Sequence, residues 1–133
     1  HLTQLTRLDL AGNKFSGQIP SSIGNLVQLH SLYLDDNHFS GSIPDDLGQL
    51  TELVSIDLSF NAYLSVEPSN IFLLPNLEVL DLSNNKGLTG SFPSSKASNG
   101  LRLLALTLTR ISVSLENDFF INLKLLEVLV LRE

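Results

Sequence analysis

The chain has 133 residues, a formal net charge of −6 and no cysteine. Its length favours one folding unit. The lack of cysteine excludes disulfide scaffolds, cysteine-containing zinc sites and cysteine nucleophiles within the chain. Its eight Lys and Arg residues are scattered, so no basic stripe points to nucleic acid as a partner. No apolar run is long enough for direct insertion into a membrane.

An apolar frame recurs along the chain and ends each time in an asparagine. The asparagines follow one another at a constant spacing of 24 residues and are Asn13, Asn37, Asn61 and Asn85. Within a frame, pairs such as Leu8 and Leu10 have the two-residue period of a short strand with one buried face. We expect these strands to stack as a parallel sheet. We expect the asparagines to form a structural ladder that satisfies backbone groups where the chain turns away.

The segment after the asparagine is nearly identical in the first two repeats. It reads Phe15-Ser16-Gly17-Gln18-Ile19-Pro20 and then Phe39-Ser40-Gly41-Ser42-Ile43-Pro44. Phe and Ile are predicted to fill the core, and Pro to begin the next turn. Small or acidic residues follow the prolines and are predicted to cap short helices of the 3₁₀ type, as with Ser21 and Ser22, Asp45 and Asp46, Ser69 and Asn70, and Ser94 and Ser95.

The combined string resembles the plant-specific class of leucine-rich repeat. It reads Leu-x-x-Leu-x-Leu-x-x-Asn-x-Phe-Ser-Gly-x-Ile-Pro and occurs twice between Leu5 and Leu50. Residues 70–93 resemble the irregular repeats of plant receptor-like proteins, and receptor-like kinases share much of this sequence pattern. The resemblance implies an α/β leucine-rich-repeat solenoid. Such a fold is a right-handed superhelix with a concave parallel β-sheet and short 3₁₀ or irregular convex segments.

The later repeats depart from the pattern. In the third, Leu64 comes one residue late, and the fourth has one extra residue after Asn85. The fifth has Thr109 in place of asparagine, and a sixth begins at Leu123. We therefore predict a single domain over residues 1–133, with about five 24-residue repeats and a terminal strand. Neither end carries a polar capping repeat, so we expect an uncapped fragment of a longer solenoid with apolar surface at its ends.

The outward positions of the predicted strands are the candidates for ligand binding. Tyr33 interrupts a column of aspartates, and Tyr and Phe supply rigid contact area beside carboxylates that select cations. Asp57 and Asp81 also belong to the Leu-Asp-Leu motif that is common in the family, which favours a scaffold role for them. From the fourth repeat onward the columns are apolar, which indicates either a hydrophobic contact zone or a strand shifted by one residue. The candidate ligand-binding residues are Arg7, Tyr33, Asp35, Asp36, Asp57, Ser59, Phe60 and Asp81.

The resemblance implies part of the extracellular domain of a plant receptor-like protein or receptor-like kinase. Such a parent would lie at the extracellular face of the plasma membrane or in the cell wall. It would bind a peptide, glycan or protein and signal in immunity or development with a co-receptor kinase ectodomain. The alternative is a soluble, polygalacturonase-inhibitor-like inhibitor of cell-wall-degrading enzymes. No enzyme, metal site or cofactor is predicted, because His1, His30 and His38 have no catalytic or metal-binding spacing.

Overall fold

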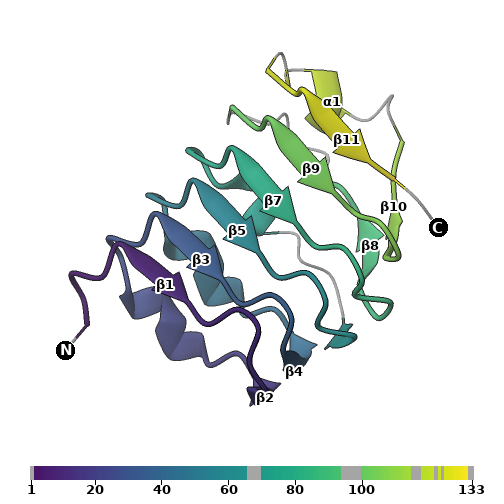
Figure 1. Ribbon diagram of the computed structural model, residues 1–133. Coiled ribbons are helices and arrows are strands. Elements are labelled where there is room, and N and C mark those ends of the chain that lie inside the picture. The colour runs from purple at the N-terminus through teal and green to yellow at the C-terminus, as the bar shows by residue number, and fades with distance from the viewer. Residues whose placement is uncertain are drawn as a thin grey trace.

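The concave side of the protein is a parallel sheet with one short strand from each repeat. The computed structural model describes residues 2–65, 70–93, 100–114, 118–121, 123 and 125–131. The strand order is β1-β3-β5-β7-β9-β11, so neighbours in the sheet come from successive repeats (Figure 1). The strands are β1 (Arg7–Asp9), β3 (Ser31–Tyr33), β5 (Ser55–Asp57), β7 (Val79–Asp81), β9 (Leu103–Ala105) and β11 (Val128–Val130).

The register of this sheet confirms the alignment of the repeats. Leu32 pairs with Ile56, and Ile56 with Leu80, so the central residue of each strand forms one column. All three of these side chains are fully buried, because the middle residue of each strand points into the core. Val79 pairs with Leu103 and Leu103 with Val128, so the outward columns continue without a one-residue shift.

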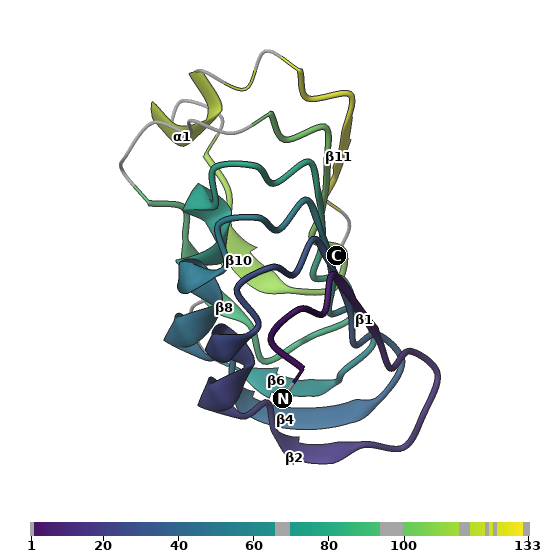
Figure 2. The ribbon, with the colours of Figure 1, turned by 90° about the vertical axis from the view of Figure 1, so that its left-hand side faces the viewer.

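Short helices form the opposite wall of the solenoid. Three are 3₁₀ helices, as predicted for the convex side, and they stack away from the six-stranded sheet (Figure 2). Their bounds, and those of a single α-helical turn near the C-terminus, are η1 (Ser21–Asn25), η2 (Asp45–Gln49), η3 (Ile71–Leu73) and α1 (Asp118–Ile121). No helix in the part of the chain that the structure describes is long and apolar enough to cross a membrane.

The predicted helix caps are wrong. Pro20 and Pro44 occupy the N-cap positions of η1 and η2, and neither helix has a side-chain cap hydrogen bond. The residues expected to cap are therefore the first helical residues, where the carboxylates of Asp45 and Asp46 interact favourably with free backbone N–H groups. Asn70 is the N-cap of η3 but also makes no cap bond. The other predicted caps, Ser69, Ser94 and Ser95, lie outside the described residues.

A second set of parallel strands, which the sequence did not predict, lies between the concave sheet and the helices (Figure 2). These strands are β2 (Ser16–Gln18), β4 (His38–Ser42), β6 (Tyr63–Ser65), β8 (Thr89–Ser91) and β10 (Arg110–Ser112). β2, β4 and β6 pair in that order, and β8 pairs with β10. Gly17 pairs with Phe39, whereas Gly41 pairs with Leu64, so this sheet absorbs the one-residue delay of Leu64.

The asparagine ladder is confirmed inside the solenoid. Asn61 is fully buried, and its Nδ2 donates to the carbonyl of Leu34 in the preceding repeat at 2.9 Å. Its Oδ1 accepts from the backbone N–H of Phe39 at 3.0 Å. Asn85 makes the same donation, but its buried Oδ1 has no partner among the described residues. Thr109 Oγ1 donates only to a carbonyl of its own repeat, so the side-chain links between repeats weaken toward the C-terminus.

The core is continuous through the middle coils and opens at the first. Ile19 and Ile43 are buried as predicted, and so is Phe39. Phe15 was predicted to be buried as well, but it is 46% exposed and stacks on Phe39 with a centroid distance of 6.3 Å. The prediction fails for Phe15 because its partner coil covers only one side of the ring.

Candidate functional site

Asp57 lies at the centre of the outward face of the concave sheet and is held by a local turn. Its Oδ1 accepts from the backbone N–H of Ser59 at 2.9 Å and from the Ser59 hydroxyl at 2.6 Å. Asp81 accepts from the N–H of Ser83 in the same way, at 2.9 Å. Ser59 is only 4% exposed, so the expectation that it faces a ligand is wrong. It orients the carboxylate of Asp57 instead, because the turn directs its hydroxyl back toward that group.

A cation, an aromatic ring and a carboxylate meet at the N-terminal end of the face. The Arg7 guanidinium lies 2.8 Å from Asp9 Oδ2 and 4.7 Å above the centroid of the Tyr33 ring. The Tyr33 hydroxyl donates to Ser55 Oγ at 3.3 Å, which fixes the ring across β3 and β5. The hydrogen bond from Arg7 lowers the pKa of Asp9. Arg7 and Tyr33 were both candidates from the sequence, whereas their partners Asp9 and Ser55 were not.

The next carboxylates along the face have a different electrostatic environment. Burial raises the pKa of Asp57 above its ordinary value, although hydrogen bonds from Ser59 oppose the shift. Burial also raises the pKa of Asp35, and nearby negative charges, including those of Asp36 and Asp81, add to the effect. Both carboxylates would thus be stabilised as anions by an added positive charge.

Asp36 and Phe60 lie apart from the face, in a hollow just beyond the strand ends. The hollow has a volume of about 370 Å³, and Phe60 is 58% exposed there. Its lining residues are Asp36, Asn37, His38, Phe60, Ala62, Asn84 and Lys86. The predicted candidates therefore divide into a group on the face, comprising Arg7, Tyr33, Asp35, Asp57 and Asp81, and a group in this hollow at its rim, comprising Asp36 and Phe60.

The column that contains Asp36 and Phe60 has an unusual backbone conformation. Asp36, Phe60, Asn84 and Leu108 all have positive φ angles, between 52° and 59°, and Gly12 has a φ of 66°. This conformation ends each strand, and the N–H of Phe60 donates to the carbonyl of the next repeat at 2.9 Å. These residues are therefore turn residues rather than a fourth outward column of the strands. The Gly and Asn at two of the positions were the sequence signal for this conformation.

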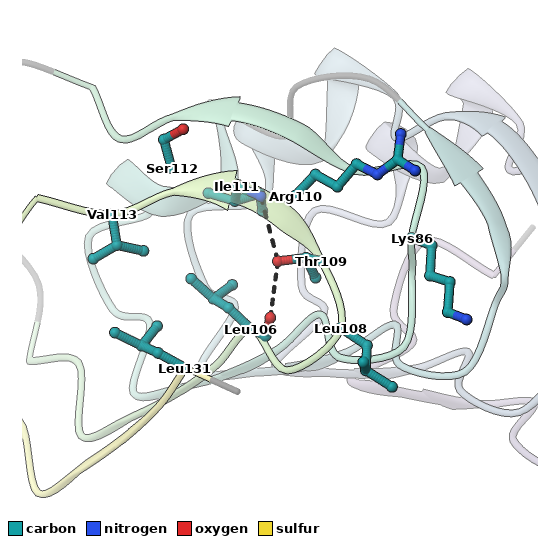
Figure 3. Close-up of a pocket in the computed structure, with 9 residues that line it drawn as sticks. All are labelled: Lys86, Leu106, Leu108, Thr109, Arg110, Ile111, Ser112, Val113 and Leu131. Atoms are coloured by element: carbon teal, nitrogen blue, oxygen red, sulfur yellow. Dashed lines mark hydrogen bonds between the residues drawn. The ribbon is translucent and has the colours of Figure 1, made fainter. Parts of the chain in front are cut away.

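A larger hollow, of about 630 Å³, lies at the C-terminal end of the solenoid (Figure 3). Leu106, Thr109 and Ile111 line it, together with Lys86 and Arg110. Leu106 and Ile111 are buried like their counterparts Leu34 and Phe39, whereas Thr109 is half-buried and its counterpart Asn37 is buried. None of the predicted candidate residues lines this hollow, and we assign no ligand site to it.

Family comparison agrees with this repeated geometry. The family model described as Leucine Rich Repeat matches residues 4–26, 28–50 and 76–97, which together make up just over half of the chain. The chain belongs to the leucine-rich repeat family. A comparison of this leucine-rich-repeat chain with the curated proteins found no significant match.

Solved leucine-rich-repeat structures of plant receptors are similar to the chain. The PEPR1–AtPEP1 structure is 37% identical over 92% of this chain, with a TM-score of 0.83. The plant peptide hormone receptor RGFR1, solved with RGF2, is 31% identical over 98% of this chain, with a TM-score of 0.75. The Arabidopsis receptor kinase HAESA, solved with the peptide hormone IDA and the co-receptor SERK1, is 31% identical over 83%, with a TM-score of 0.60. The chain spans only 17%, 24% and 22% of these three proteins.

Phe60 is expected to make the folded protein less stable than a polar residue at the same position would. Its left-handed backbone conformation costs a non-glycine residue roughly 1 kcal/mol, a cost that asparagine tolerates better, and asparagine stands at this position in the next repeat as Asn84. The Phe60→Asn variant should therefore unfold at a higher urea concentration. Val27→Asn, which replaces another exposed apolar residue, at 54% exposure, should give no such gain. An equal gain in both variants would mean that lost surface hydrophobicity, and not backbone strain, is the cause.

Proposed function

We propose that this chain is a segment, with several leucine-rich repeats, of the ligand-binding ectodomain of a plant cell-surface receptor, and that its concave face binds a peptide. The observation that carries the proposal is the similarity to PEPR1, at 37% identity and a TM-score of 0.83, in a structure solved with AtPEP1. The binding residues in the proposal are those of the face (Arg7, Tyr33, Asp35, Asp57 and Asp81) and of its rim (Asp36 and Phe60). No catalytic step is part of it.

The proposal extends to location and partner. A receptor ectodomain of this kind would lie at the extracellular face of the plasma membrane or in the cell wall, and further coils would continue the solenoid. The HAESA structure includes the co-receptor SERK1, which supports a co-receptor kinase ectodomain as a second partner of the parent protein. The relatives named above are receptors, which favours this function over a soluble inhibitor of cell-wall-degrading enzymes.

Selection of peptides from a displayed random library on the 133-residue chain tests this function. We expect selected peptides to lose about tenfold in affinity with Tyr33→Ala, because an aromatic residue central to a contact surface commonly contributes this much or more. Val27→Ala removes an exposed apolar side chain elsewhere and should leave the affinity unchanged. Peptides that bind Tyr33→Ala and the unaltered chain equally would place the binding site elsewhere and contradict the proposal.

A further inference from the structure

The outward face of the concave sheet changes character along the solenoid. It carries the carboxylates of Asp57 on β5 and Asp81 on β7, and Asp35 lies just after the end of β3. Over β9 and β11 the outward residues are apolar: Val128 is 42% exposed, Leu103 and Val130 are half-buried, and Ala105 is buried. Because the register is continuous from β1 to β11, the two zones form one uninterrupted surface.

The carboxylates in the first zone are close to one another and have no cation beside them among the described residues. Asp57 and Asp81 are directly paired positions on adjacent strands, an arrangement in which like charges destabilise a sheet. The ion pairs found in the described residues are those of Arg7 with Asp9 and of Arg102 with Glu127. Neither neutralises Asp57 or Asp81.

The N-terminal edge of the same face shows how it accommodates a cation. There the Arg7 guanidinium pairs with Asp9 at 2.8 Å and lies over the ring of Tyr33 at 4.7 Å. The far side of Tyr33 is followed by Asp57, its pairing partner on β5. A guanidinium or ammonium group from outside the chain would likewise meet carboxylates one or two strands further along. No cationic side chain among the described residues pairs with Asp57 or Asp81 there.

We infer that the face binds an extended peptide segment with a cationic part over β3, β5 and β7 and an apolar part over β9 and β11. The inference rests on the proposed function and adds the chemistry and order of the ligand. Charge complementarity selects the first part, and burial of exposed apolar surface, Val128 included, selects the second. Five strands at about 4.8 Å spacing extend over roughly 19 Å. An extended segment of about six or seven residues covers that length.

Defined synthetic peptides test the inference. The first probe is a heptapeptide with blocked ends and the sequence Arg-Ala-Arg-Ala-Leu-Ala-Leu, used together with its reversed sequence because either chain direction fits the inference. The second has Glu in place of Arg, and the third has the composition of the first with Arg and Leu interleaved. We expect the first probe, in one direction, to bind the 133-residue chain about tenfold more tightly than the other two, with an advantage over the Glu peptide that falls as salt rises.

Two substitutions locate the effect. Asp57→Asn combined with Asp81→Asn keeps both side-chain shapes and should abolish the preference for Arg over Glu. The matched control is Asp45→Asn combined with Asp46→Asn, which removes the same two charges from η2, away from the face. This control should leave the preference intact. An equal loss in both would mean that overall charge, and not the face, selects the peptide, and would overturn the inference.

The outcomes separate this inference from the proposed function. If library peptides depend on Tyr33 but the ordered basic and apolar probe binds no better than the Glu or interleaved probes, the ligand chemistry inferred here is wrong and the peptide-binding function stands. If no selected peptide depends on Tyr33, the proposed function itself fails. If the ordered probe binds with the expected preference and loses it in the Asp57 and Asp81 double variant, both stand.

Discussion

Replacing Asn61 with alanine is expected to lower the free energy of unfolding by about 3 kcal/mol, since each buried polar group left without a partner costs about 1–3 kcal/mol. The variant would remove the bond to the Leu34 carbonyl at 2.9 Å and the acceptor of the Phe39 N–H at 3.0 Å. Both bonds join neighbouring repeats, so their loss weakens the contact between two coils. Urea unfolding followed by circular dichroism measures the change.

Two other asparagines of the ladder serve as controls for this prediction. Asn13 is exposed and bonds only within its own repeat, so Asn13→Ala should cost well under half as much, because water replaces the lost partner. Asn85 donates to the preceding repeat, but its Oδ1 accepts no bond from the part of the chain that the structure describes, so Asn85→Ala should fall between the two. A similar loss in all three variants would show that helix or strand propensity, rather than the buried bonds, sets the cost.

The concave sheet and the ladder could be predicted from the sequence because burial imposes their period. Leu32, Ile56 and Leu80 each point inward from the middle of a strand, and an asparagine follows at a constant distance. Any shift by one residue would expose the apolar column, so the pattern admits one register. This reasoning remained valid in the later repeats, where Leu103 and Val128 align as the repeats require.

The features that sequence reasoning missed depend on backbone geometry and not on burial. The strand β2 contains Ser16, Gly17 and Gln18, all exposed, so no alternation of apolar and polar residues predicts this strand. The helix caps failed because Pro20 takes the position at which a serine would bond to the backbone. Ser59 was placed on the exposed face because its column was aligned as outward, whereas Ser59 and its counterpart Ser83 are both buried and Ser59 bonds to Asp57.

The candidate site was predictable as a surface but not as an arrangement. Arg7 and Tyr33 were identified as outward residues of adjacent repeats, which the pairing of β1 with β3 confirms. Their cation–π contact depends on side-chain conformations that a column alignment does not contain. Likewise, Phe60 was identified as exposed, but its position beyond the strand follows from a positive φ angle of 55° that its residue type does not favour.

Gly24→Ala is expected to destabilise the protein by about 2 kcal/mol, a cost typical of adding a methyl group where the structure has no room. A Cβ atom at Gly24 would lie 2.8 Å from Asp46 Cβ and 3.1 Å from the Asp46 carbonyl oxygen. At Gly48 the nearest atom would be Asn70 Cβ at 3.1 Å, and at Gly100 it would be Leu125 Cδ1 at 3.5 Å. The three alanine variants should therefore rank in that order in urea unfolding, with Gly100→Ala close to neutral.

The same substitution also tests how the two walls of the solenoid are coupled. The strands β1 and β3 remain joined by backbone hydrogen bonds, so an added methyl group at Gly24 can be accommodated only by moving η1 away from η2. Wider spacing on the convex side with fixed spacing on the concave side increases the curvature of the sheet and tilts Arg7 relative to Tyr33. Peptides that depend on Tyr33 should consequently bind Gly24→Ala more weakly than Gly100→Ala, and equal binding would show that the convex helices move without altering the face.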